Sequence, residues 1–145
     1  MTKVIPFKPE HLQSLDGETF SRLGLVPDWL KKAEHFNGNG TCFSGFADGQ
    51  FVACAGISIL WPGVGEAWAV ITPNIYKHPL FFHKSIVQGL NTIIEKHNLY
   101  RVQATVLSGF EKGDEWIKRL GFEPEGIMRK YDAEGLDHTR YAKVM

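Results

Sequence analysis

The sequence predicts a single α/β domain of the mixed α+β kind, extending over residues 1–145. Alternating apolar and polar residues typical of strands recur near both ends and in the middle of the chain, and a strand–helix–strand–helix run occupies Gly65 to Gly121. A chain of 145 residues has the size of one domain, and no repeat or linker divides it. Sixteen acidic and sixteen basic residues leave no net charge, which argues against nucleic acid or an anionic membrane as a partner.

The N-terminal part is expected to hold one short strand followed by helices. Residues 4–5 form the strand, and Pro9 suits the first position of a short helix because a first-turn residue needs no amide donor. Apolar residues recur at helical spacing over 18–36, where Gly24 and Pro27 favour two short helices over one long helix. The NGNG run at 37–40 is a turn signal.

Three antiparallel strands should follow. The alternation over 41–60 breaks at Asp48-Gly49, a dipeptide that strongly favours a two-residue hairpin turn. Pro62-Gly63 predicts a second turn, and the next strand, beginning near Glu66, ends at Pro73.

The second half of the chain predicts two helices and three more strands. A stripe of apolar residues predicts a helix from Pro79 to His97, followed by a strand over 100–107. Ser108, with Glu111 three residues later, matches a capping box for a helix that ends at Gly121. The last two strands, near 127–131 and 139–144, should turn at Glu134-Gly135, with Asp137 paired to Arg140 or Arg129.

The cysteines and histidines indicate no metal site. Cys42 and Cys54 lack the short spacing of zinc ligands and are expected to be buried free thiols. His78 and His83 stand five residues apart and so do not share a helical face. With neither a signal peptide nor a membrane-spanning run of apolar residues, the sequence favours a soluble cytoplasmic protein.

Three segments carry a family resemblance that covers nearly the whole chain. They are the strand ending in VIT ahead of a basic turn and long helix, the strand RVQATVL, and the ending WIKRLGFEPEGIMRKY. Together they resemble the GCN5-related N-acetyltransferases, and GEAW with HPLFFHKS is similar to small acetyltransferase-like proteins of tailed phages. The resemblance implies a central, twisted, mostly antiparallel sheet of six to seven strands flanked by about four helices. For a phage protein the location would be the host cytoplasm or the virion.

The same resemblance implies acetyl-coenzyme A as cosubstrate and a primary amine as acceptor, at a protein N-terminus, a lysine or a small molecule. In the family the pyrophosphate lies on amides at the start of the long helix, and pantetheine lies beside the preceding strand, where two strands part. Carried over, the cofactor-binding residues are Val70, Ile71, Thr72, Lys77, His78, Leu80, Phe81, Phe82, His83, Lys84 and Phe110.

The sequence departs from the family at the pyrophosphate turn and in the last helix. The stretch 77–82 lacks both usual glycines, and Pro79 removes one amide, leaving the amides of Leu80, Phe81 and Phe82 as expected donors. Nearby lysines and histidines could offset the loss, or the turn could simply be an exposed polar one. Ile117 stands where many relatives have a tyrosine acid.

Glu66 and Ser108 are the catalytic candidates that the resemblance implies. Glu66 lies on the strand whose carboxylate faces the acceptor amine in relatives and is our candidate base, directly or through a water; a surface glutamate is the alternative. Ser108 would lie near the pantetheine sulfur, although the capping role competes for its hydroxyl. Phe110 is either a cofactor contact or a core residue.

Three functions therefore remain open. The first is an active N-acetyltransferase that transfers the acetyl group directly, without a covalent enzyme intermediate. The second is a phage structural or assembly protein that retains the fold without the activity, and the third is a regulator that binds the cofactor without turnover. A homodimer is also left open.

Overall fold

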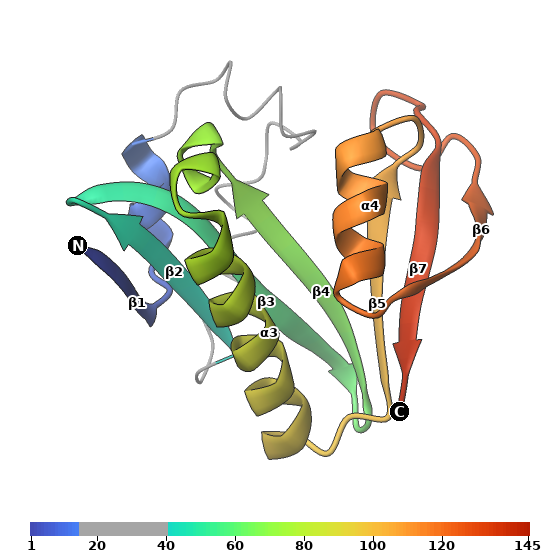
Figure 1. The fold of residues 1–145 in the computed structure, drawn as a ribbon. Helices are drawn as coiled ribbons and strands as arrows, with labels where there is room; N and C mark the ends of the chain where they lie inside the picture. Colours follow the sequence, from blue (N-terminus) through green and yellow to red (C-terminus); the bar gives the residue numbers. More distant parts are fainter. Residues whose placement is uncertain (15–40) are drawn as a thin grey trace.

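The computed structural model describes residues 1–14 and 41–145 (Figure 1). The helices expected over 18–36 and the turn at 37–40 lie outside the described residues. The elements, in chain order, are β1 (Thr2–Pro6), the 3-10 helix η1 (Pro9–Ser14), β2 (Cys42–Ala47), β3 (Gln50–Trp61), β4 (Val64–Ile71), the 3-10 helix η2 (Pro73–Lys77), α3 (Pro79–Lys96), β5 (Arg101–Leu107), α4 (Glu111–Arg119), β6 (Glu123–Met128) and β7 (His138–Val144).

One seven-stranded sheet organises the molecule, in the order β1-β2-β3-β4-β5-β7-β6. Every neighbouring pair is antiparallel except β4 and β5, which are parallel. The mixed, mostly antiparallel sheet expected from the sequence is confirmed. The described residues contain two α-helices and two short 3-10 helices rather than about four full helices.

Turn chemistry accounts for the order of the first strands. Asp48 and Gly49 both adopt positive φ angles, 51° and 79°, as the tightest hairpin turns require. At the next turn Gly63 has φ 89°, and a Cβ there would lie 1.9 Å from the Tyr100 ring. Glycine is therefore required at position 63 by both backbone conformation and space.

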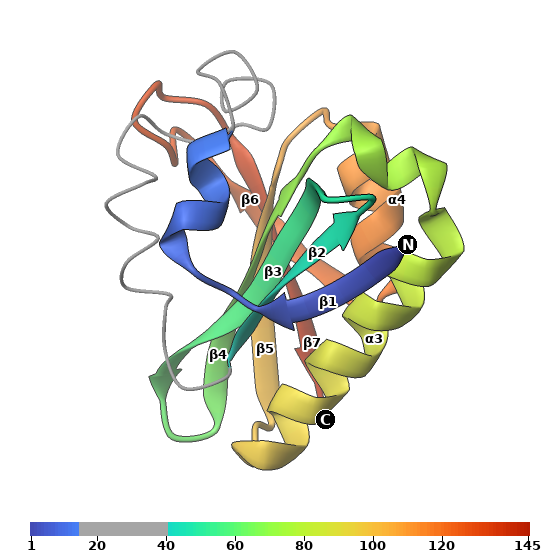
Figure 2. The same cartoon turned by 90° about the vertical axis from the view of Figure 1, so that its left-hand side faces the viewer.

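The two α-helices cover one face of the sheet, and η1 lies on the other (Figure 2). Beneath the helices, Ile93 of α3 and Ile117 of α4 belong to a core cluster with Val102 of β5. On the opposite face Leu12 of η1 packs with Val70 of β4. Because successive side chains of a strand point to opposite faces, the sheet has an apolar layer on either side.

Two sequence predictions at the ends of elements are wrong. Ser108 caps no helix: the residue before α4 is Phe110, and α4 has no side-chain cap. The amide of Phe110 donates to the carbonyl of Leu107 at 3.1 Å, and Gly109 has φ 92°, so a tight turn separates Ser108 from the helix. The strand expected near 127–131 is β6, which begins at Glu123 and ends at Met128.

Candidate functional site

The central strands β4 and β5 part soon after they meet. They pair at only three positions, from Val64 with Arg101 to Glu66 with Gln103. β4 then continues to Ile71 and β5 to Leu107 without pairing to each other, as the widening gap in Figure 1 shows. Residues 67–71 of β4 therefore have no partner on β5, which leaves main-chain groups on this edge for a ligand.

The start of α3 lies at the open end of this gap. His78 precedes the helix and Pro79 is its first residue. The amide of Phe82 donates to the carbonyl of His78 at 3.2 Å, so the expectation of a free amide at Phe82 is wrong. Only the amides of Leu80 and Phe81 precede the first intrahelical bond, and both residues are exposed.

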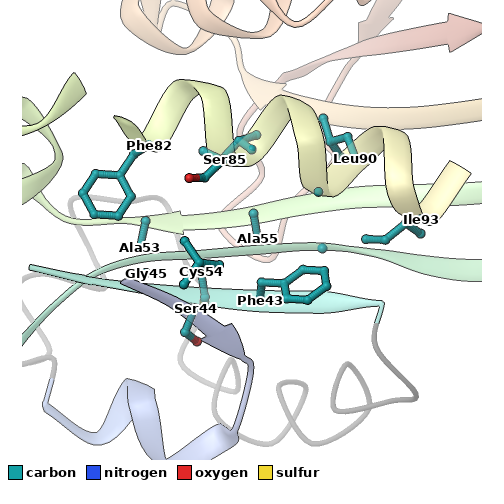
Figure 3. Close-up of a pocket in the computed structure, with 14 residues that line it drawn as sticks. Phe43, Ser44, Gly45, Ala53, Cys54, Ala55, Phe82, Ser85, Leu90 and Ile93 are labelled. Atoms are coloured by element: carbon teal, nitrogen blue, oxygen red, sulfur yellow. The ribbon is translucent and has the colours of Figure 1, made fainter. Parts of the chain in front are cut away.

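The side chain of Phe82 is also unavailable to a ligand. It is buried, and its ring lies on Gly45 of β2 so closely that a Cβ at position 45 would come within 2.6 Å of it. Figure 3 shows this ring above β2 at one end of a cavity of about 50 Å³ between α3 and strands β2 and β3. A water needs roughly 10–15 Å³, so this apolar cavity is too small for pantetheine. Phe82 attaches α3 to the sheet.

Lysine and histidine side chains surround the start of α3. Lys77 and Lys84 are exposed, His78 and His83 are half-buried, and the first turn contains no acidic residue. One carboxylate lies close: the pKa of Asp48 is lowered chiefly by its hydrogen bond from the amino-terminal ammonium, and also by the charges of His78 and Lys77. The helix dipole and the lysines together favour an anion here.

The three residues at the end of β4 have different surroundings. Val70 is fully buried on the η1 side, and Ile71 packs on the α3 side beside Phe82. Thr72 is buried, and both its amide and its hydroxyl donate to the carbonyl of Val52, at 2.9 and 2.7 Å. The Thr72 side chain therefore fixes β4 to β3, and of these residues only the main chain of β4 is left for a cofactor.

Glu66 forms an ion pair that the sequence did not indicate. Nη1 of Arg140 donates to both carboxylate oxygens of Glu66 at 2.9 Å. The expected pairing of Arg140 with Asp137 is wrong, because Asp137 instead accepts a hydrogen bond from the amide of Lys130 at 2.9 Å. β7 lies next to β5, so Arg140 reaches across β5 to a residue 74 positions earlier. No local pattern could have revealed this contact.

A second ion pair lies beside the first one. Arg101 of β5 donates to both oxygens of Glu125 at 3.0 and 2.6 Å, and also to Gln103 at 3.0 Å. The hydrogen bond from Arg101 is the main cause of the lowered pKa of Glu125. Side chains from three strands, β5, β6 and β7, thus form a polar surface next to Glu66.

The remaining candidates lie around the start of α4. The Ser108 hydroxyl is 3.2 Å from that of Thr139 and half-buried. Phe110 is 44% exposed, so it is not a core residue; its ring lies over Gly113, where a Cβ would come within 2.5 Å. Ile117, at the position of the family tyrosine, is buried in the core.

Tyr141 does not take the place of that missing tyrosine. It is buried, and its hydroxyl donates to Asp114 of α4 at 2.8 Å. Burial, and then this hydrogen bond, raise the pKa of Tyr141 to about 12. Tyr141 therefore connects α4 to β7 and keeps its proton through the neutral range.

No pattern in the sequence indicates a role for Tyr76 or Lys112. The ammonium of Lys112, in the first turn of α4, lies 5.3 Å from the centre of the Tyr76 ring in η2. Both residues are at the open end of the gap between β4 and β5. Their approach depends on the tertiary arrangement of two separate elements, which spacing along the chain cannot predict.

Within residues 1–14 and 41–145, no group of three or more His, Cys, Asp or Glu side chains could hold a metal ion. Cys42 and Cys54 are buried and are not joined by a disulfide, as expected, and burial raises the pKa of Cys54. No described helix has both the length and the apolar character to cross a membrane.

Solved structures of acetyltransferases share this architecture. Ard1 from Thermoplasma volcanium matches with a TM-score of 0.81 at 11% identity, covering 99% of this chain and 97% of its own. A ribosomal-protein-alanine N-acetyltransferase from Brucella melitensis matches with a TM-score of 0.74 at 14% identity, covering 99% of both chains. A GNAT-family acetyltransferase from Streptococcus pneumoniae gives 0.70 at 14% identity, covering 100% and 99%.

No family model matches the sequence, and neither does any curated protein. At these low identities the structural likeness defines the fold. The chain has the fold of the GCN5-related N-acetyltransferases.

Proposed function

We propose that the protein is an N-acetyltransferase that transfers the acetyl group of acetyl-coenzyme A to a primary amine. The observation that carries the proposal is the parting of β4 from β5 directly beside a helix start surrounded by cations. An extended, amide-containing chain with a phosphorylated end matches both features: unpaired main chain for its amides and positive charge for its phosphates.

The residues present can hold such a cosubstrate. They offer fewer main-chain donors for its pyrophosphate than the family pattern does. The amides of Leu80 and Phe81, with the side chains of Lys77 and Lys84, would hold the pyrophosphate. The edge of β4 over 67–71 would receive the pantetheine. When bound, the cosubstrate supplies an acetyl thioester, whose carbonyl carbon is open to attack by an amine.

Glu66 is our candidate for the base on the acceptor side. Transfer joins the amine nitrogen to the acetyl carbon and breaks the carbon–sulfur bond; the amine loses a proton to the base, and solvent protonates the departing thiolate. A thiolate whose conjugate acid has a pKa near 8.5 leaves without a dedicated acid, which suits the isoleucine at 117. Arg140 donates one hydrogen bond to each carboxylate oxygen of Glu66, and each oxygen retains a lone pair that can accept a proton.

Calorimetry with coenzyme A tests the cosubstrate. Lys77→Ala combined with Lys84→Ala should weaken binding about tenfold or more, because two cations at the helix start are removed. Lys8→Ala combined with Lys118→Ala is the matched control, since both lysines are exposed, Lys8 lies between β1 and η1, and Lys118 is in the last turn of α4. Equal affinities for the two double variants would remove the phosphate role of Lys77 and Lys84.

Kinetics with a panel of amines and N-terminal peptides test the base. Glu66→Gln should lower kcat by about a hundredfold at neutral pH while changing coenzyme A affinity less. An unchanged pH–rate profile would rule out Glu66.

The alternative is a protein with this fold that performs a structural or assembly role without turnover. Pro79 and the engaged amide of Phe82 favour it, because together they leave two main-chain donors at the turn. If the folded wild-type protein binds no coenzyme A at millimolar concentration, the structural role replaces the enzymatic one.

A further inference from the structure

Tyr76 and Lys112 form a contact between the two sides of the gap. Tyr76 belongs to η2, the link from β4 to α3, and Lys112 to the first turn of α4, the helix that follows β5 (Figure 1). The Lys112 ammonium lies 5.3 Å from the centre of the Tyr76 ring. The ring nevertheless remains 64% exposed.

Neither residue is explained by the stability of the fold. A lysine in the first turn of a helix opposes the helix dipole, which favours acidic residues there. An exposed cation–aromatic contact shifts an equilibrium by only about two- to fivefold, so it opens readily. The ring is also too exposed to contribute much to a core.

Apolar side chains continue this surface on both sides of the gap. Leu80 and Phe81 of α3 are 78% and 37% exposed, and Phe110, just before α4, is also exposed. Exposed apolar side chains thus follow Tyr76 closely in the chain and precede Lys112, whose ammonium lies over the Tyr76 ring. This combination suits a flat aromatic base that carries phosphate.

We propose that Tyr76 and Lys112 bind the nucleotide end of the cosubstrate, with the ring stacking on adenine and the ammonium pairing with a phosphate. This inference rests on the proposed function and extends its site from α3 to α4. It also explains how a turn with two free amides can hold a polyanion, because Lys112 adds a charge from the opposite side. Two acids share the first turn with Lys112: Asp114 accepts the hydrogen bond of Tyr141, and Glu111 is exposed.

Calorimetry with coenzyme A and with adenosine 3′,5′-bisphosphate, which lacks pantetheine, tests the assignment. Lys112→Gln should weaken binding of both ligands about tenfold, as should Tyr76→Leu, whereas Tyr76→Phe retains the ring and should bind like the wild type. Lys118→Gln, in the last turn of the same helix, is the matched control. Raising the salt concentration should weaken the wild type more than Lys112→Gln.

The outcomes separate this inference from the proposed function. If the wild type binds coenzyme A and both Lys112→Gln and Tyr76→Leu bind it equally well, this inference fails and the proposed function stands. A third outcome is that the wild type binds the bisphosphate but not coenzyme A, and that Lys112→Gln weakens binding of the bisphosphate. In that case the nucleotide site stands without the acetyltransferase role. If the wild type binds neither ligand, both proposals fail. Unchanged melting temperatures would confirm that the variants are folded.

Discussion

Two helices begin at the open end of the gap between β4 and β5, and their first turns are built in opposite ways. α3 begins with His78 and Pro79, has no acidic residue in its first turn and is surrounded by cations. α4 has Glu111 and Asp114 in its first turn, and Asp114 accepts a hydrogen bond from Tyr141. The α4 start is therefore balanced by its own acids, whereas α3 leaves its positive end for a ligand.

The two helices are attached to the sheet by different contacts. α3 is held to the sheet by the buried ring of Phe82, so its start can present amides and cations without contributing to packing. α4 is held by a polar contact from its first turn, which uses that turn for attachment. If this is correct, substitutions at the two attachments should affect stability, whereas substitutions at the α3 start and at Lys112, which is not part of the α4 attachment, should affect binding.

Phe82→Ala should have the largest effect, a loss of about 3–5 kcal/mol in the free energy of unfolding, because it removes a buried aromatic ring. Phe81→Ala is the matched control: this neighbouring ring is 37% exposed, so its loss should be below about 1 kcal/mol. Urea denaturation of both variants measures the difference. Similar losses would mean that Phe82 is not the attachment of α3.

Tyr141→Phe should have the next largest effect, about 1–2 kcal/mol, because it removes the donor to Asp114 and keeps the ring. Tyr131→Phe serves as control, since Tyr131 is 49% exposed. The same denaturation experiment measures both. A loss no larger than that of the control would show that the hydrogen bond does not hold α4.

The same contact should make the free energy of unfolding depend on pH in the alkaline range. The pKa of Tyr141 is raised to about 12, above the value near 10 of an unfolded tyrosine. The stability linked to this shift is fully present below pH 10 and is lost as the pH rises toward 12, because the unfolded chain releases the proton first. Tyr141→Phe should lose less stability over this window than the wild type. Parallel curves would contradict the raised pKa.

Pro79→Gly should have the smallest effect, on binding instead of folding. It restores an amide at the first position of α3, raising the donors from two to three, and should strengthen coenzyme A binding by up to about 1 kcal/mol. Pro79→Ala restores the same amide without the backbone freedom of glycine. Comparing the two variants therefore separates the effect of the added donor from the effect of the closer approach that glycine allows. If calorimetry shows no gain in either variant, the turn does not bind the pyrophosphate through its main chain.

The sequence predicted the fold better than the site because the fold depends on local signals. The Asp48-Gly49 turn and the apolar stripe that begins at Pro79 are readable within a few residues, and both are confirmed. The contacts of Glu66 with Arg140 and of Tyr76 with Lys112 join distant segments, and no spacing rule encodes them. The capping box at Ser108 failed because Gly109 inserted a turn between the serine and the helix.

The three residue pairs that join β4 to β5 also bear on the order of folding. β1 to β4 form consecutive antiparallel neighbours, and the turns at Asp48-Gly49 and Pro62-Gly63 close locally. The β4–β5 pairing instead requires the whole of α3 to form and cross between the strands, so its contacts are more distant in sequence. We therefore expect the amides of β3 and β4 to become protected from hydrogen exchange first during refolding. The amides of β5 that pair with β4 should become protected only when the two parts of the sheet have joined.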